Sequence, residues 1–219
     1  LGKDLVKNQQ PNQTEFHILI SHFHWDHIQG LPFFTPIYNP KSTINIYSPT
    51  TVESTHKYLD LLFDYSFSPF SGLDSMPAKI KIHKIPTQIK IEDLSISYCP
   101  LDHLPNKHTD TYSYKMETNN TNVVIAIDHE AKQSNVNNDF IKFALNTDLL
   151  IHNAHYTESH YEPDKGYSST TQALNNALAC KAKKTLLTHY HPNLTDKEIL
   201  AEYKRLKQKK HYSFLDFDF

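Results

Sequence analysis

The stretch that decides how this chain is interpreted is His22-Phe23-His24-Trp25-Asp26-His27, which places three imidazoles and a carboxylate within six residues. His and Asp are seldom buried without a partner, so packing alone explains the pattern poorly. Side chains two residues apart at a strand end share a face, so His22 and His24 can converge on one metal ion, while Asp26 and His27 can reach a second ion where a short helix begins. The alternative is a polar loop with chance histidines, in a chain that has 15 of them.

The composition describes an ordinary globular chain of 219 residues, for which we expect a single domain over residues 1–219. A net charge of -2 gives no basic footprint for nucleic acid, so a large nucleic-acid partner is disfavoured. Cys99 and Cys180 have no C-x-x-C partner, which argues against a disulfide framework and favours a reducing, cytoplasmic location. No stretch approaches the roughly 18 apolar residues of a membrane span.

Hydrophobic periodicity predicts an alternation of strands and helices. The expected strands cover residues 15–21, 43–48, 148–151, 185–188 and 213–219, with several short strands between 79 and 127; the expected helices cover 51–65, 140–145, 168–184 and 196–209, with a helix end at 1–7. Ser169 or Thr170 can cap the third helix, and Thr195 the last. The aromatic segment 66–78 is either a lid over a pocket or a loop packed on its own side chains.

Three further candidate ligands stand just after expected strands. They are His103, Asp128 and His189. Each alone is also compatible with a surface or helix-capping residue, but their shared placement favours a common site with the first motif.

These residues together resemble the metallo-β-lactamase superfamily, whose hallmark is H-x-H-x-D-H followed by separated His, Asp and His ligands. Residues 18–34, ILISHFHWDHIQGLPFF, are similar to the branch related to ribonuclease Z and cyclic-nucleotide phosphodiesterases. The resemblance implies an α/β fold, an αββα sandwich with the site at one edge of its two sheets. It also implies two divalent ions, with zinc first and manganese or iron as alternatives. One ion would be held by His22, His24 and His103, the other by Asp26, His27 and His189, with Asp128 as the bridge.

The sequence departs from the resemblance in two places. Relatives have two or three strands before the position of Leu1, so we expect a sandwich that lacks its first strands. Relatives also carry a G-H-S-T type segment, and in Gly166-Tyr167-Ser168-Ser169-Thr170 we expect Ser169 at the histidine position. Ser169 and Thr170 are therefore the candidate substrate-binding residues. Serine cannot act as a general acid near neutral pH, and the possible substitutes are His155, His160 and His191.

The leading hypothesis is a dinuclear metal-dependent hydrolase of small or cyclic nucleotide phosphodiesters, with metal-activated water as the nucleophile and Asp26 and Asp128 as the catalytic carboxylates. One alternative is a thioester, lactone or lactam hydrolase on the same scaffold. Another is a catalytically impaired metal- or ligand-binding module. A homodimer is the assembly we would test first.

Overall fold

The computed structural model describes residues 14–103, 111–132, 134–212 and 216–218. The chain divides into two compact units, residues 1–86 (unit 1) and 87–219 (unit 2). The helix end expected at residues 1–7 lies outside the described residues, and the single domain stays a prediction.

Unit 1 is built on a parallel sheet with the strand order β1-β2-β3. Its strands are β1 (Glu15–Leu19), β2 (Thr43–Ser48) and β3 (Lys79–Lys84). In β2, Ile44 and Ile46 are both buried in the core of unit 1. Parallel neighbours need crossover connections, and these are α2 (Trp25–Ile28), η1 (Leu31–Phe33) and η2 (Thr35–Tyr38) after β1, then α3 (Val52–Leu62) and η3 (Leu73–Ser75) after β2.

The later part of the segment 66–78 packs into the core of unit 1, whereas Phe67 is 85% exposed. Leu73 and Met76 are buried in the same cluster as the strand residues of unit 1. Gly72 has a φ of 108°, and a Cβ there would clash with Asp60 Oδ1, so the turn requires glycine. Of the two alternatives left open by the sequence, these contacts favour the packed loop over the lid.

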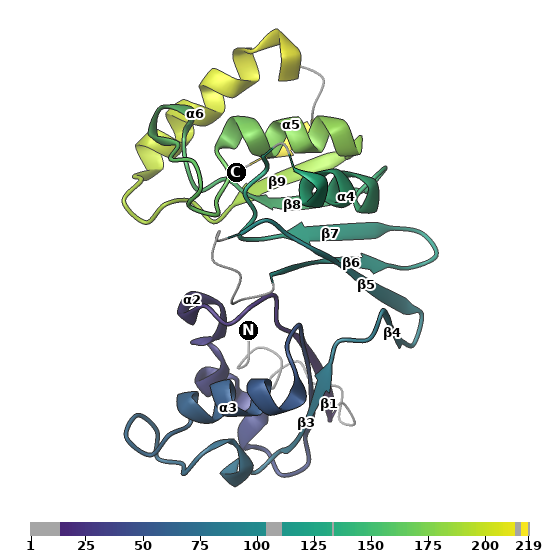
Figure 1. Cartoon of the computed structure of the whole chain (residues 1–219), viewed down its shortest axis with the longest axis vertical. Coiled ribbons are helices and arrows are strands. Elements are labelled where there is room, and N and C mark those ends of the chain that lie inside the picture. Colours follow the sequence, from purple (N-terminus) through teal and green to yellow (C-terminus); the bar gives the residue numbers. More distant parts are fainter. Residues whose placement is uncertain (1–13, 104–110, 133, 213–215, 219) are drawn as a thin grey trace. The chain divides into compact units, whose positions relative to one another are not determined.

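Unit 2 carries a sheet with the strand order β10-β9-β8-β7-β6-β5-β4 (Figure 1). Strands β4 to β7 pair antiparallel, and β7 to β10 pair parallel. The strands are β4 (Gln88–Ile91), β5 (Leu94–Pro100), β6 (Tyr112–Glu117), β7 (Asn122–Ala126), β8 (Leu149–Asn153), β9 (Lys184–Thr188) and β10 (Asp216–Asp218). Since β5 and β7 are both antiparallel to β6, the carboxyl ends of β5, β7, β8 and β9 lie at one edge of the sheet.

Three α-helices of unit 2 accompany this sheet: α4 (Asn135–Phe143), α5 (Thr170–Cys180) and α6 (Asp196–Gln208), with η4 (Glu158–His160) and η5 (Lys210–Tyr212) between elements. Figure 1 shows α4 and α5 against the sheet. Phe140 of α4 and Ala177 of α5 share a buried cluster with Val124 of β7. Leu206 of α6 packs with Leu187 of β9 in a second cluster.

Three helix boundaries differ from the prediction by three residues or more. The helix expected at 51–65 ends at Leu62, and Phe63 caps it. The helix expected at 140–145 begins at Asn135, where Ser134 Oγ accepts from the backbone N–H of Asn137. The helix expected at 168–184 ends at Cys180, because Lys181 adopts the left-handed conformation with a φ of 54°. Lys184 already belongs to β9.

Candidate metal centre

The three downstream ligand candidates stand at the common edge of the unit 2 sheet. His103 follows β5, Asp128 follows β7, and His189 directly follows β9. All three strands run in the same direction, so these side chains come together although they are far apart in the sequence. The structure thus confirms their predicted placement just after strands.

The Asp128 carboxylate lies between two of the imidazoles. His103 Nε2 is 3.5 Å from Asp128 Oδ2, and His189 Nε2 is 3.3 Å from Asp128 Oδ1. Each carboxylate oxygen therefore faces a different histidine. Two ligands bonded to one tetrahedral zinc ion at 2.0–2.1 Å are separated by about 3.3 Å, which matches both distances.

The orientation of His103 is set by a contact on the far side of its ring. Its Nδ1–H donates to the Gly166 carbonyl at 2.7 Å, and a carbonyl oxygen can only accept. In the neutral ring Nε2 is then an acceptor, and it faces the Asp128 carboxylate, which is also an acceptor. A cation between the two resolves this opposition, and a second hydrogen bond on the other ring nitrogen is what metal-bound histidines usually have. The donor set of unit 2 therefore fits a divalent metal.

Backbone conformation helps to aim two of these side chains. Asp128 and His189 both have positive φ values, 59° and 60°. Among non-glycine residues, Asp and His are enriched in this left-handed region, and such conformations cluster at functional sites. The chain thus turns sharply at the ends of β7 and β9.

Unit 1 contributes the other four ligand candidates from the loop after β1 and from α2. The ligand atoms of His22 and His24 lie within 4.8 Å of one another. His27 Nε2 is 3.2 Å from Asp26 Oδ2, and the ring centroids of His22 and His27 are 4.3 Å apart. The short helix expected after the motif is present as α2. The first motif therefore clusters its own imidazoles and carboxylate, as the spacing suggested.

Two residues that the sequence did not single out support this edge of unit 2. The buried Glu130 carboxylate accepts hydrogen bonds from Tyr161 Oη at 2.8 Å, Asp164 N at 2.7 Å and Gly166 N at 3.1 Å. Glu130 thereby fixes the loop whose Gly166 carbonyl orients His103. Its position two residues after Asp128 is the only sequence signal that could have drawn attention to it.

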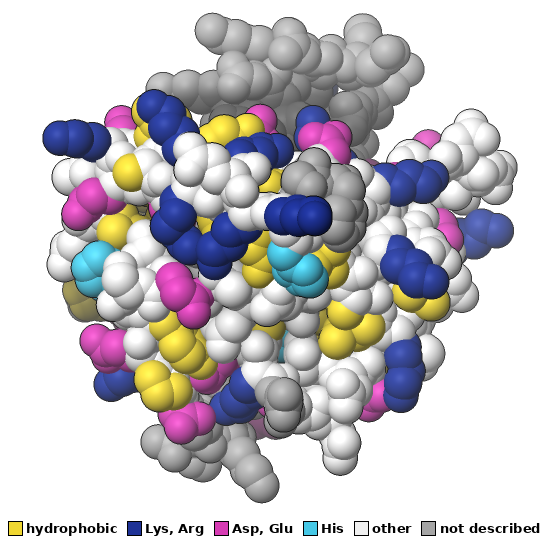
Figure 2. Space-filling model, turned by 90° about the horizontal axis from the view of Figure 1, so that it is seen from above, with side chains coloured by type: hydrophobic (Ala, Val, Ile, Leu, Met, Phe, Trp, Pro, Cys, Tyr) yellow, Lys and Arg dark blue, Asp and Glu magenta, His cyan; other side chains and the backbone are white. Residues whose placement is uncertain are grey.

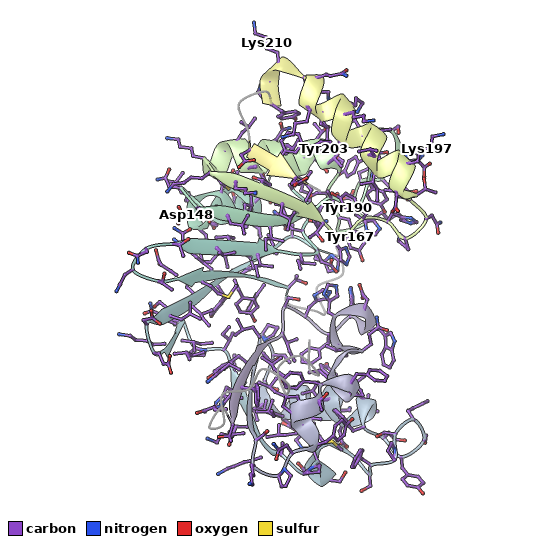
Figure 3. All side chains as sticks on the ribbon, turned by 180° about the vertical axis from the view of Figure 1, so that it is seen from behind. Asp148, Tyr167, Tyr190, Lys197, Tyr203 and Lys210 are labelled. Carbon is purple, nitrogen blue, oxygen red and sulfur yellow. The ribbon has the colours of Figure 1, made fainter. Side chains whose placement is uncertain are left out.

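Tyr167 is the second residue that the sequence left aside. Its ring, labelled in Figure 3, stacks on His155 with the centroids 4.2 Å apart, and lies 5.1 Å from the His103 ring and 5.9 Å from the His189 ring. Letter by letter against G-H-S-T, the residue after Gly166 is Tyr167. The segment therefore places a tyrosine, rather than Ser169, beside two ligand candidates.

Ser169 and Thr170, the expected substrate-binding residues, are both buried and hydrogen-bonded within unit 2. Ser169 Oγ accepts from Gln172 N at 3.2 Å in a capping box that starts α5. Thr170 Oγ1 donates to Glu202 Oε1 at 2.5 Å. These contacts account for both hydroxyls structurally, and their contact with a substrate stays a prediction.

The surface charge agrees with the small net charge of the chain. Lys and Arg side chains are interspersed with Asp and Glu on the face shown in Figure 2. In the part of the chain that the structure describes, every helix is too short or too polar to cross a bilayer.

Comparisons with known proteins converge on one family. The family model described as "Beta-lactamase superfamily domain" matches residues 6–190. A ribonuclease Z from Thermoplasma acidophilum is 37% identical over 79 residues, which is 35% of this chain and 25% of that enzyme.

Two solved structures are similar over most of the chain. The metallo-β-lactamase fold protein YhfI from Bacillus subtilis has a TM-score of 0.65 and 19% identity, covering 92% of this chain and 74% of that protein. A diphosphatase of the PhnP family has a TM-score of 0.65 and 17% identity, covering 99% of this chain and 72% of that protein. The sequence match to the curated ribonuclease thus spans only a quarter of its length.

Proposed function

Because the chain belongs to the metallo-β-lactamase superfamily, a superfamily of metal-dependent hydrolases, we propose that it is a dinuclear phosphodiesterase acting on small phosphodiesters, including nucleotides. In this proposal His22, His24 and His103 hold one divalent ion, and Asp26, His27 and His189 hold the other. Asp128 bridges the two.

The observation that carries the proposal is the placement of the Asp128 carboxylate. Its two oxygens face two different imidazoles at 3.5 Å and 3.3 Å. A carboxylate that served only one histidine would have no reason to present each oxygen to a separate ring. This arrangement supports one ion on each side of Asp128.

The charge of the donor set supports an anionic substrate. Two divalent ions, when bound, would activate water as a nucleophile and neutralise the phosphoryl oxygens. Asp26 and Asp128 are the only carboxylates in the proposed ligand set, so the loaded site would keep a positive charge. A phosphodiester anion suits such a site better than a neutral ester or amide does.

The residues of the chain have separate tasks in this scheme. Asp128 holds its charge between His103 and His189, and Gly166 keeps His103 with Nε2 directed toward the carboxylate. Glu130 holds the loop that carries Gly166. Preorganised ligands of this kind need little rearrangement when the substrate binds.

The printed names of two relatives favour phosphate chemistry. One is a ribonuclease and the other a diphosphatase. The two names share only the hydrolysis of a bond to phosphate, and we carry over no more than that. Zinc is the first choice of metal, with manganese and iron as alternatives, because all three accept imidazole and carboxylate ligands.

The test is a substrate profile of the purified protein with its metal content measured in the same sample. Bis(p-nitrophenyl) phosphate should be hydrolysed, and chelation of the metal should abolish turnover. Faster hydrolysis of an aryl thioester, a lactone or a lactam would assign the chain to the acyl-hydrolase alternative. Bound metal with no turnover of any of these substrates would point to a binding module.

A further inference from the structure

We propose that a cavity in unit 2, beside His189, binds a planar aromatic group of the substrate, such as a nucleobase. The cavity has a volume of about 500 Å³, and its walls include His155, Tyr156, Tyr161 and His191. The inference rests on the proposed phosphodiesterase and names the part of the substrate that this enzyme would recognise.

One wall of the cavity contacts a ligand candidate of the metal centre. His155 Nδ1–H donates to the His189 carbonyl at 3.1 Å, and His191 N donates to the His155 carbonyl at 2.9 Å. The ring centroids of His155 and His189 are 5.7 Å apart. A group attached to a phosphate at His189 therefore needs only a short reach to enter the cavity.

The walls have the chemistry that planar rings prefer. The rings of Tyr156 and His191 are 6.2 Å apart at 27°, and those of Tyr156 and Tyr161 are 6.2 Å apart at 75°. Rings at mixed angles offer both faces and edges to an inserted aromatic group. Base stacking on aromatic side chains is sequence-tolerant, because every base has a π-face.

A hydrogen bond holds the Tyr161 wall of the cavity in place. Tyr161 Oη donates to the buried Glu130 carboxylate, which also fixes Gly166 next to His103. The same carboxylate therefore positions a wall of the cavity and a ligand of the candidate metal centre. Because both depend on Glu130, the Tyr161 wall keeps a fixed position relative to His103.

The charge of the lining residues determines which aromatic groups the cavity can bind. Glu162 and Glu198 line the cavity, and the described lining residues include no Lys or Arg. The Glu198 carboxylate accepts from Thr195 N at 2.8 Å and Thr195 Oγ1 at 2.7 Å, and these hydrogen bonds lower its pKa. A neutral or amino-bearing ring fits here, whereas additional phosphates of a long nucleic acid would be repelled.

Two substrates with the same reacting bond test the inference. Methyl p-nitrophenyl phosphate and the p-nitrophenyl ester of thymidine 5′-monophosphate share their leaving group and differ in the group that would fill the cavity. We expect wild-type kcat/KM to be about tenfold higher for the thymidine ester, equivalent to 1.4 kcal/mol. Tyr156→Leu should remove this preference and leave hydrolysis of the methyl ester unchanged.

The matched controls are Tyr156→Phe, which keeps the ring, and Tyr65→Leu, which makes the same change at a side chain that is 77% exposed in unit 1. Both should keep the preference. Equal kcat/KM values for the two esters in the wild type would overturn the inference while leaving the phosphodiesterase intact. Turnover of neither ester would contradict the proposed function instead.

A binding measurement keeps the cavity testable apart from catalysis. Calorimetric titration with adenosine, which has a base but no phosphate, should give saturable binding to the wild type, Tyr156→Phe and Tyr65→Leu, and at least about tenfold weaker binding to Tyr156→Leu. If Tyr156→Leu fails to fold, His191→Ala replaces it. Equal adenosine affinity in the wild type and the folded cavity variant, or no binding to the wild type, would overturn the inference.

Discussion

Asp128 is the residue on which the proposed chemistry depends most. It is fully buried, stands at the turn after β7, and presents one oxygen to each of two histidines. A buried carboxylate is costly unless it is paired or binds a metal. The pairing of each oxygen with an imidazole, and the metal ions of the proposed site, would both offset that cost.

Asp128→Asn should reduce kcat/KM for bis(p-nitrophenyl) phosphate by about 10³-fold, because the amide has the same shape but lacks the negative charge that bridges the ions. Steady-state kinetics and circular dichroism should be measured together. Asp139→Asn, the same change at an exposed side chain of α4, should leave turnover unchanged. Wild-type turnover in Asp128→Asn with an intact fold would refute the bridging role.

The buried His152 ring makes the unfolding free energy depend on pH. Burial lowers the pKa of His152 to about 3. Its Nδ1–H donates to the Asn153 carbonyl at 2.8 Å, and its Nε2 accepts from Asn176 Nδ2 at 3.2 Å, so the neutral ring is fully hydrogen-bonded. In the unfolded chain, His152 binds a proton near pH 6.5. The contribution of the neutral His152 ring to the unfolding free energy is therefore fully present above pH 6.5 and is lost as the pH falls toward 3.

The expected loss from His152 alone is about 2 kcal/mol of unfolding free energy between pH 7 and pH 5. Urea denaturation at both pH values measures it. His152→Gln should show a smaller decrease, because glutamine does not titrate. An equal decrease in wild type and variant would mean that His152 is not the group responsible.

The site residues were predictable to different degrees. The spacing of the first motif identifies four candidate ligands, His22, His24, Asp26 and His27. Their position just after expected strands identifies three more, His103, Asp128 and His189. Tyr167 and Glu130 could not be found in this way, because their contacts arise when the loop after β8 folds back over the sheet edge. The Ser169 hydroxyl caps α5, and the expectation that Ser169 stands at the histidine position stays a prediction.

At the scale of elements, the first turn of α5 is stabilised by a reciprocal cap between Ser169 and Gln172. Ser169 Oγ accepts from Gln172 N, and the Gln172 side chain accepts from Ser169 N at 2.8 Å. Such reciprocal caps satisfy backbone donors that the helix itself leaves unpaired.

Ser169→Ala should lower the unfolding free energy by about 1 kcal/mol, because it removes the cap. Ser169→Asp keeps an acceptor at the cap and should recover most of the loss. Thermal or urea denaturation measures both variants, alongside KM for bis(p-nitrophenyl) phosphate. Unchanged stability with a raised KM in Ser169→Ala would instead support the substrate contact.

Helix boundaries were less predictable than helix existence. The start of α4 was missed because Asn137 occupies an inward position where an apolar residue is expected. Its amide donates to Asn176 Oδ1 at 3.2 Å and accepts from Asn176 Nδ2 at 2.9 Å, so the interface between α4 and α5 is partly polar. The end of α5 was placed too late because a lysine, rather than the usual glycine, takes the left-handed terminal position.

At the scale of the whole chain, the α/β fold of the metallo-β-lactamase type is confirmed by the family model over residues 6–190 and by the structural likeness to YhfI. The alternation of strands and helices made this class predictable. The strand order of unit 2 was not predictable from periodicity, because it depends on pairings between distant segments. The homodimer stays a prediction.

The central claim is that seven side chains hold two metal ions. The most direct measurement is the metal content of the purified chain by inductively coupled plasma mass spectrometry, after dialysis against metal-free buffer. The account predicts two equivalents of divalent transition metal per chain. One equivalent or none, in a folded sample that has been offered zinc, manganese and iron, would contradict it.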